Sequence, residues 1–379
     1  MLKLIRKIFV AVLIVYVALF GLTKAIRYPE PIAAIKLGLA PASKTPDLMP
    51  AHTIKAASTP ALWKTGSEAM PATVSFEGKT IGFEEFLAST HTNAFLVIRD
   101  GVLTYEKYYN GIGAQTRLPS YSVAKTMTSL MIGKLIDKGV IKESDTFVSI
   151  LPQFKAGTPF DKVTIKDLLD MQAGIGVSDN YPTGPSGWGV AISQMYASTD
   201  IDWFLLQNRK MREAPGTFAE YRSIDTQMLG MIIKKVTGAS LVDYFSENIW
   251  QKVGASNVAT WNVDRVGGTE KAFCCFNATA RDYALIGAEL IKPASAIISS
   301  AWLARISTPV VTLDYGWGYG AQVWHPFPGI NLMMGLHGQF VWMDPARKTV
   351  IVKLSDEPTS SDGRSERVAP VLKGISEQN

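Results

Sequence analysis

The sequence predicts an α+β fold, in which an antiparallel β-sheet is flanked by terminal helices and accompanied by a mainly helical subdomain. Three patterns predict it: a strand hairpin before a long apolar helix, several helices in the middle of the chain, and closely spaced strands toward the C-terminus. Strands joined by short turns pair antiparallel, because a parallel pair needs a long crossover. With 379 residues, 47% of them hydrophobic, the chain is long enough to bury a large core.

Residues 1–27 predict export or membrane anchoring. The apolar run 8–22 has five basic neighbours and no acidic residue before position 28: Lys3, Arg6, Lys7, Lys24 and Arg27. The run is shorter than a full span of roughly 18 to 20 residues unless the basic side chains snorkel, and no good cleavage site follows it. We favour an uncleaved anchor in the inner membrane, with a cleaved signal peptide as the alternative. Both place the rest of the chain on the periplasmic side.

Charge and cysteine content argue against a nucleic-acid-binding protein, a disulfide-rich domain and a thiolate zinc site. The basic residues of the N-terminal segment equal the whole net charge of +5, so the remainder offers no basic surface for nucleic acid. The only cysteines, Cys274 and Cys275, are adjacent, and neighbouring Cα atoms are closer than ordinary disulfide geometry prefers. We therefore expect a buried pair of small apolar side chains, with neither a disulfide framework nor a thiolate zinc site.

The first half of the chain predicts a tether, a hairpin and a central helix. Residues 28–73 are rich in Pro, Ala, Ser and Thr and predict a tether followed by irregular structure that packs on the main domain, 74–379. Within that domain, a β-hairpin is expected over 94–99 and 102–109, with Asp100-Gly101 as its turn. An apolar helix follows over 122–138 and stops at Gly139.

The second half predicts short helices and then strands. Thr164 to Asp167 resembles a capping box that opens a helix ending near Gln172, and a loop rich in Gly, Pro and Ser follows over 174–189. Further helices are expected over 224–236, 241–253 and 281–291. Strands are expected over 318–324, 332–340 and 350–354, with a closing helix over 365–375.

Ser122 and Lys125 stand at the start of the central helix, three residues apart, so both side chains lie on one helical face. The first turn of a helix presents unpaired N–H groups and positive potential. A Ser-x-x-Lys pattern occurs about once by chance in a chain of this length. Context must therefore decide between a nucleophile with its base and a helix-capping serine followed by a solvated lysine.

Three motifs in one order supply that context: Ser122-Val123-Ala124-Lys125, Tyr221-Arg222-Ser223 and Gly335-Leu336-His337-Gly338-Gln339. Together they resemble the penicillin-recognising serine hydrolases, the group of class C β-lactamases, related esterases and 6-aminohexanoate-dimer hydrolases. The resemblance covers roughly residues 75 to 375 and implies a β-lactamase/transpeptidase-like fold. It implies that Ser122 is the acyl-forming nucleophile and Lys125 its base, kept neutral by burial and by the helix N-terminus.

The second motif stands in the place of the family's Tyr-x-Asn. The resemblance implies that Tyr221 carries protons between Ser122, Lys125 and the leaving group. The alternative is a packed tyrosine at a helix start. Ser223 departs from the usual Asn, which weakens the analogy for a residue that grips the amide side chain of a β-lactam.

The third motif resembles the strand that carries Lys-Thr-Gly in β-lactamases. The resemblance implies a backbone N–H at about Gln339 that joins the Ser122 N–H in holding an oxyanion. His337 replaces the lysine that attracts a β-lactam carboxylate, and it either polarises the substrate or hydrogen-bonds within the sheet. Tyr181 lies where a loop tyrosine flanks the pocket of amide-hydrolysing relatives, with an ordinary loop aromatic as the alternative. Strand aromatics such as Tyr319 either line the cleft or pack.

We therefore expect a serine hydrolase that cleaves a carboxylic ester or small amide through an acyl-serine intermediate, without metal or other cofactor. The α/β-hydrolase motif Gly-x-Ser-x-Gly and the zinc motif His-Glu-x-x-His are both absent. The alternatives are a β-lactamase, a D-amino-acid peptidase, or a sensor that stays acylated. No pattern in the sequence indicates an oligomeric state.

Overall fold

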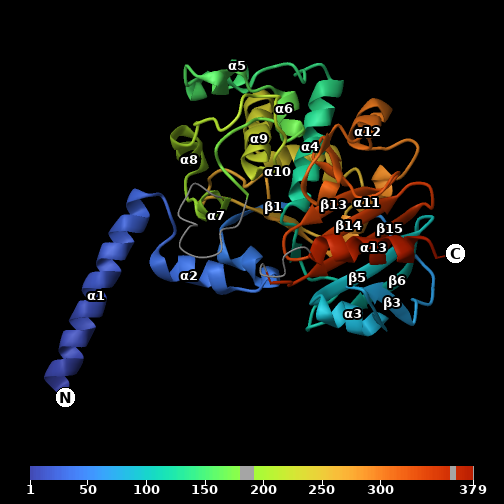
Figure 1. Ribbon diagram of the computed structural model, residues 1–379, viewed down its shortest axis with the longest axis horizontal. Helices are drawn as coiled ribbons and strands as arrows, with labels where there is room; N and C mark the ends of the chain where they lie inside the picture. Colours follow the sequence, from blue (N-terminus) through green and yellow to red (C-terminus); the bar gives the residue numbers. More distant parts are fainter. Residues whose placement is uncertain (180–191, 359–363, 379) are drawn as a thin grey trace.

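The largest sheet of the computed structural model, which describes residues 1–179, 192–358 and 364–378, has nine strands (Figure 1). Its strand order is β10-β11-β12-β13-β14-β15-β5-β6-β2, and all neighbours are antiparallel except the short parallel pair β2 and β6. The predicted antiparallel sheet is thus confirmed, with one parallel edge. The strands are β2 (Lys64–Thr65), β5 (Thr92–Arg99), β6 (Val102–Tyr108), β10 (Val311–Thr312), β11 (Gly318–Gly320), β12 (Val323–His325), β13 (Asn331–Gly335), β14 (Gln339–Asp344) and β15 (Thr349–Ser355).

Helices cover both faces of this sheet. Successive residues of β14 alternate between two core clusters: Val341 packs with α11 (Ala280–Leu290), and Trp342 packs with α13 (Arg364–Ser376) and α3 (Phe83–Ser89). This alternation follows from the period of two along a strand. Both faces are apolar, so the central strands β14 and β15 are buried along their whole lengths.

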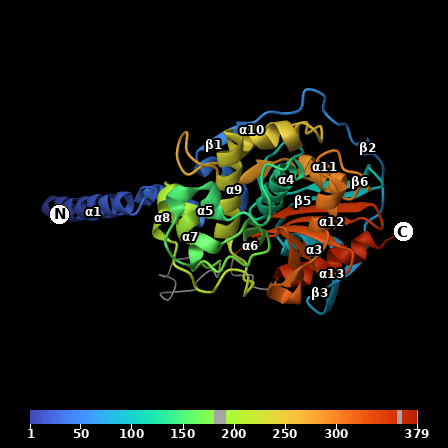
Figure 2. The same cartoon turned by 90° about the horizontal axis from the view of Figure 1, so that it is seen from above.

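A helical subdomain lies beside the sheet in both views (Figures 1 and 2). Its helices are α4 (Val123–Asp137), α5 (Phe147–Ile150), α6 (Ile165–Leu169), α7 (Ile192–Ala197), α8 (Ile201–Gln207), α9 (Ser223–Thr237) and α10 (Leu241–Phe245). α4 is buried from Val123 to Gly133 and packs against α9. The predicted capping box is confirmed, since Thr164 Oγ1 accepts from the Asp167 N–H at 3.1 Å and Asp167 Oδ2 accepts from the Thr164 N–H at 2.9 Å.

A second, four-stranded sheet supports the chain just before α4. Its order is β1-β8-β9-β7, built from β1 (Ala51–Ile54), β7 (Leu118–Pro119), β8 (Ala259–Asn262) and β9 (Phe276–Ala278). The Ser120 N–H donates to the Phe276 carbonyl at 2.7 Å, one residue beyond β7. The second sheet therefore fixes where α4 begins.

The predicted hairpin turn and the predicted helix ends at glycine are confirmed. The hairpin β5 and β6 turns at Asp100 and Gly101, which have φ of 47° and 77°, as a two-residue primed turn requires. α4 and α9 are followed by Gly139 and Gly238 in the left-handed conformation, with φ of 69° and 68°.

Three expectations about the fold need correction. The strand predicted over 318–324 is the hairpin of β11 and β12, which turns at Ala321 and Gln322 with φ of 46° and 68°. The strand predicted over 332–340 is a hairpin: β13 and β14 are joined at 336–338, where His337 and Gly338 have φ of 64° and 77°. Apolar residues on both sides of a short turn resemble one continuous strand, and positive φ is uncommon for any residue other than glycine. Residues 28–73 contain more structure than expected: α2 (Pro31–Leu39), the 3-10 helix η1 (Ala42–Leu48) and β1, which pairs with β8.

α1 (Leu2–Ala25) extends away from the rest of the molecule (Figures 1 and 2). By length and composition it is able to cross a membrane, and none of its residues is buried. It extends beyond both ends of the apolar run 8–22. An N-terminal apolar helix with these properties suits a signal sequence or an anchor.

Candidate active site

Ser122 is the residue immediately before α4, and its side chain makes no capping hydrogen bond to the helix. Its backbone N–H donates to no acceptor within the described ranges. The hydroxyl and the N–H group both lie at the positive end of the α4 dipole. The alternative interpretation, in which the Ser122 hydroxyl caps the helix, is therefore wrong.

Lys125 lies one turn into α4 and is 1% exposed. Its ammonium nitrogen contacts three oxygens: Ser122 Oγ at 2.9 Å, Ser223 Oγ at 2.8 Å and the Phe273 carbonyl at 3.1 Å. The predicted pair of Ser122 and Lys125 is thus brought together, and the alternative of a solvated lysine is wrong.

Burial lowers the pKa of Lys125 to about 8, because an ammonium ion loses its water in this position. The carboxylates of Asp179 and Asp225 oppose that shift by favouring the charged form. Asp225 is fully buried and Asp179 is partly buried, and desolvation raises the pKa of each. A lysine with a pKa of about 8 is neutral in a useful fraction of molecules near neutral pH.

Tyr221 lies beside the pair, just before α9. The Lys125 ammonium nitrogen is 4.9 Å from the centroid of its ring. The ring stacks on Trp324 at 5.2 Å and meets Tyr319 edge-on at 5.9 Å. The structure thus brings the third predicted residue to the site on a rigid aromatic support. Tyr319 is itself buried, so its role in this site is packing.

The turn before Ser122 is held by the end of β13. Tyr121 has φ of 43°, a conformation that a bulky residue rarely adopts outside functional sites. A Cβ atom on Gly335 would lie 2.4 Å from the Ser120 carbonyl oxygen and 2.9 Å from the Ser122 nitrogen. Only glycine permits this approach of strand and turn.

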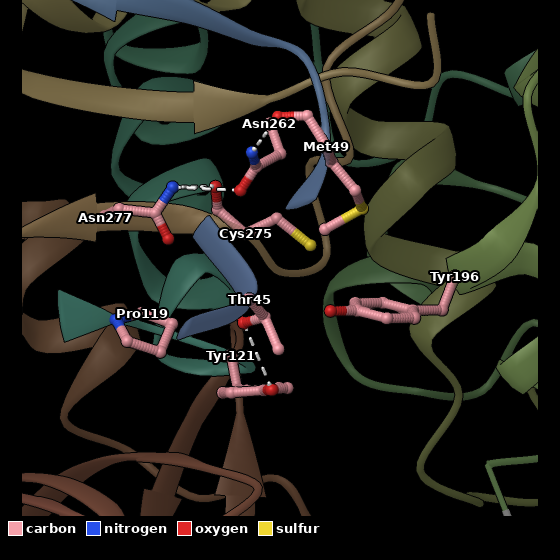
Figure 3. A pocket seen from close by; sticks show the side chains of 8 residues that line it. All are labelled: Thr45, Met49, Pro119, Tyr121, Tyr196, Asn262, Cys275 and Asn277. Carbon is pink, nitrogen blue, oxygen red and sulfur yellow. Dashed lines mark hydrogen bonds between the residues drawn. The ribbon is translucent and has the colours of Figure 1, made fainter. Parts of the chain in front are cut away.

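Aromatic side chains surround this turn. The Tyr121 ring lies between His337, at a centroid distance of 4.7 Å, and Tyr196, at 6.5 Å. Figure 3 shows the narrow pocket that Tyr121 and Tyr196 line together with Met49 and Cys275. Burial raises the pKa of Tyr121 to about 12, so this phenol stays neutral.

His337 lies in the β13–β14 turn, where its ring nitrogen Nδ1 is 2.5 Å from the Glu357 carbonyl. A carbonyl only accepts, so Nδ1 carries the proton and Nε2 is an acceptor in the neutral ring. Burial lowers the pKa of His337, which favours that neutral form. The predicted hydrogen bond within the fold is thus present, and the alternative role of polarising a substrate stays a prediction.

Gln339 begins β14 and is buried, with its side chain bonded to β15. Its amide donates to the Ser355 carbonyl at 2.7 Å and to the His337 carbonyl at 3.0 Å. Its backbone pairs with Gly335 across the hairpin. Gly335, the strand partner of Gln339, lies against the Ser122 backbone.

Two polar groups of the site were missed from the sequence. Asp179 Oδ2 accepts from the Ser223 hydroxyl at 2.6 Å, and Asp179 Oδ1 accepts from the Ser223 N–H at 2.7 Å. The other is the Phe273 carbonyl on Lys125. The sequence marked Ser223 only as a departure from the family motif, so its partner Asp179 was not foreseen. A backbone carbonyl such as that of Phe273 leaves no signal in the sequence. Tyr181, a predicted pocket residue, lies outside the described residues.

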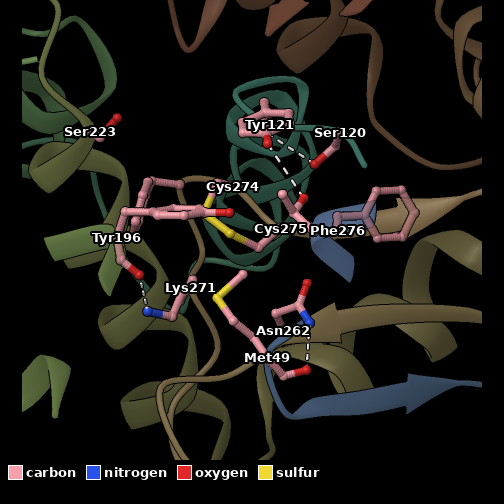
Figure 4. Close-up of a disulfide and its surroundings, with 12 residues drawn as sticks. Met49, Ser120, Tyr121, Tyr196, Ser223, Asn262, Lys271, Cys274, Cys275 and Phe276 are labelled. Atoms are coloured by element: carbon pink, nitrogen blue, oxygen red, sulfur yellow. Dashed lines mark hydrogen bonds between the residues drawn. A yellow bond between two sulfur atoms is a disulfide. The ribbon is translucent and has the colours of Figure 1, made fainter. Parts of the chain in front are cut away.

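The adjacent cysteines form a disulfide, which corrects the expectation of two free thiols (Figure 4). The objection from Cα spacing applies to cysteines in regular backbone, whereas Cys275 has φ of 71°. The disulfide follows Phe273 directly, so it lies in the segment whose carbonyls reach Lys125 and, from Phe276, Ser120. Among the described residues, no group of three or more His, Cys, Asp or Glu is placed to hold a metal ion.

Comparisons with known proteins agree with this geometry. The family model described as Beta-lactamase matches residues 83–373. The 6-aminohexanoate-dimer hydrolase of Paenarthrobacter ureafaciens is 30% identical over 301 residues, 73% of this chain and 75% of that protein. The D-alanyl-D-alanine-carboxypeptidase/endopeptidase AmpH of Escherichia coli (strain K12) is 25% identical over 182 residues, 45% of each chain.

Solved structures share the fold. A Bacillus anthracis protein provisionally named 6-aminohexanoate-dimer hydrolase has a TM-score of 0.76 at 23% identity, over 92% of this chain and 94% of that one. EstCE1, a hydrolase with promiscuous acyltransferase activity, has a TM-score of 0.61 at 15% identity, over 76% and 96%. At these identities the likeness concerns the fold alone.

Proposed function

Because the chain belongs to the Beta-lactamase family of serine hydrolases, we propose that it cleaves a carboxylic ester or a small amide through an acyl intermediate on Ser122. The observation that carries the proposal is the hydrogen bond of 2.9 Å between Ser122 Oγ and Lys125 Nζ. A buried lysine with a pKa of about 8 is able to take the proton of the hydroxyl it touches.

The reaction follows from these positions. Neutral Lys125 takes the Ser122 hydroxyl proton while Oγ attacks the substrate carbonyl carbon, and the carbonyl oxygen becomes an oxyanion. The oxyanion forms in front of the Ser122 N–H at the start of α4, where the helix dipole favours negative charge. Tyr221 passes a proton to the leaving alcohol or amine, and water then cleaves the acyl-serine by the reverse transfers.

The second oxyanion donor belongs to the β13–β14 hairpin in this proposal. The contact of Gly335 with the Ser122 backbone, together with the pairing of Gly335 and Gln339, supports a donor in this hairpin, which we keep at the Gln339 N–H. Removing one such donor costs about 3 to 4 kcal/mol of transition-state stabilisation in a serine protease.

The preference for esters and small amides over β-lactams rests on His337. In the neutral tautomer Nε2 only accepts, so this side chain offers neither a positive charge nor a donor to a β-lactam carboxylate. The 6-aminohexanoate-dimer hydrolase from Paenarthrobacter ureafaciens supports the proposed chemistry. The peptidase relative keeps D-amino-acid peptides as the second candidate.

A hydrolysis panel tests the substrate class. It contains short-chain nitrophenyl esters, a linear aminohexanoate dimer, a D-amino-acid peptide and a chromogenic cephalosporin, each with wild type and Ser122→Ala. We expect turnover of the esters or the dimer, lost in Ser122→Ala. Turnover of the cephalosporin alone would reverse the ranking, and a persistent adduct without turnover would indicate a sensor.

We also propose that α1 holds the enzyme at the periplasmic face of the inner membrane. The exposed apolar surface of α1 and its basic flanks support this position.

A further inference from the structure

A chain of hydrogen bonds runs from the proposed nucleophile to a partly buried acid. Ser122 Oγ lies 2.9 Å from Lys125 Nζ, and Lys125 Nζ lies 2.8 Å from Ser223 Oγ. Ser223 in turn donates twice to one carboxylate, through its hydroxyl to Asp179 Oδ2 at 2.6 Å and through its N–H to Asp179 Oδ1 at 2.7 Å. Asp179 is thus linked to Ser122 through two intervening side chains.

The neutral form of Lys125 must aim its lone pair at Ser122 to act as a base. A neutral amine has two N–H groups and one lone pair, and three oxygens surround this nitrogen. The Phe273 carbonyl only accepts, so it takes one N–H. If Ser223 Oγ takes the other N–H, the lone pair faces Ser122.

The Ser223 hydroxyl is ambiguous by itself, because it is able to donate or accept. A hydroxyl that donated to Lys125 would occupy the lone pair and turn an N–H toward Ser122. The carboxylate removes this ambiguity, since it accepts the hydroxyl proton at 2.6 Å and leaves Ser223 Oγ to accept from Lys125. The backbone N–H of Ser223 holds the same carboxylate in place.

We propose that Asp179 is a positioning residue for the hydrolysis: through the Ser223 hydroxyl, it directs the lone pair of Lys125 at the hydroxyl of Ser122. The inference rests on the proposed function. It also gives a role to serine at position 223, where the family motif has an Asn whose amide carbonyl could only accept.

Asp179 also acts on Lys125 by its charge. Among the described residues, the charged or titratable groups that face Lys125 are Asp179 from the segment after α6, Asp225 from α9, and the ring of Tyr221. Arg222 lies near the two acids. Removing the Asp179 charge leaves less to stabilise the ammonium, so the pKa of Lys125 moves further down. The substitution therefore weakens the base by misdirection and moves its titration toward lower pH.

A double-mutant cycle tests the inference with Asp179→Asn, Ser223→Ala and the double variant. The readouts are kcat/KM for a nitrophenyl ester, its pH profile, and the rate at which a fluorophosphonate labels Ser122. We expect Asp179→Asn to lower kcat/KM by roughly tenfold or more, as part of the 10²–10⁴-fold rate enhancement that a positioned general base contributes. Its acid limb should move to lower pH. The double variant should be no slower than Ser223→Ala within about twofold, because Asp179 acts through Ser223.

Other results would overturn the inference. Losses that multiply in the double variant would mean that Asp179 acts independently of Ser223, and a wild-type rate in Asp179→Asn would mean that it does not act at all. A lower rate without movement of the acid limb would indicate a structural defect. Asp179→Ala repeats the comparison if the Asn variant melts early. Wild type that neither labels at Ser122 nor turns over any ester would refute the proposed function as well.

Discussion

The pH dependence of the enzyme follows from the burial of Lys125. With a pKa of about 8, instead of the ordinary 10.5, about a tenth of the lysines are neutral at pH 7. An exposed lysine would be neutral in about 0.03% of molecules, so burial raises the amount of base roughly 300-fold. We expect kcat/KM to rise about tenfold per pH unit below pH 8 and to level off above it.

The same burial costs stability while Lys125 is charged. Its pKa is lower in the folded than in the unfolded chain, so the unfolded chain binds more protons between about pH 8 and 10.5. The cost is about 3 kcal/mol below pH 8 and fades as the pH rises toward 10.5. Replacing Lys125 by Met removes this term, although it also removes three hydrogen bonds. Relative to Lys125→Met, wild type should gain about 2 to 3 kcal/mol between pH 7 and pH 10.

Two assays measure these effects. The rate of Ser122 labelling by a fluorophosphonate between pH 6 and 9 reports the base, without the alkaline hydrolysis that affects nitrophenyl esters. Urea unfolding of wild type and Lys125→Met at pH 7 and pH 10 reports the stability difference. A flat labelling profile, or a stability difference equal at both pH values, would refute the assignment of Lys125 as a buried, readily neutralised lysine.

Three further predictions concern the surroundings of the site and the N-terminus. Gly335→Ala should lower kcat/KM by up to about 100-fold, because the added Cβ collides with the turn before α4. The control Gly374→Ala, on the open face of α13, should keep activity and add about 0.5 to 1 kcal/mol to the free energy of unfolding. Equal activities of the two variants would contradict the close approach of Gly335 to the turn. The double variant Cys274→Ser/Cys275→Ser should lose about 1 kcal/mol in urea unfolding together with part of kcat/KM, and unchanged values would show that the disulfide does not support the Lys125 loop. The full chain should partition with membranes until detergent is added, whereas a soluble mature chain starting beyond α1 would indicate a cleaved signal.

The parts of the fold that the sequence predicted depend on local signals. The β5–β6 hairpin follows from Asp100-Gly101, and α4 follows from its apolar run and Gly139. Ser122 and Lys125 meet because three residues separate them on one helix, which requires no tertiary information. The β13–β14 turn was not predicted, because His337 takes the left-handed conformation, with positive φ, that is usually expected of glycine or asparagine.

The parts of the site that could not be predicted from the sequence depend on contacts between segments far apart in the chain. Asp179 meets Ser223 across 44 residues, and Phe273 meets Lys125 across 148. No periodicity or capping pattern links such positions. Tyr221 was placed correctly beside Lys125 only because the order of motifs resembles a family, and its contacts with Trp324 and Tyr319 had no sequence signal. The disulfide was missed because its backbone turn was not foreseen.

Trapping the covalent intermediate tests the proposed chemistry most directly. Wild type is mixed with a short-chain nitrophenyl ester, quenched in acid within the first turnover, digested, and mapped by mass spectrometry. We expect the acyl mass on the peptide that contains Ser122, at Ser122 itself, and none in Ser122→Ala. An acyl group on another residue, or continued hydrolysis by Ser122→Ala, would contradict the account.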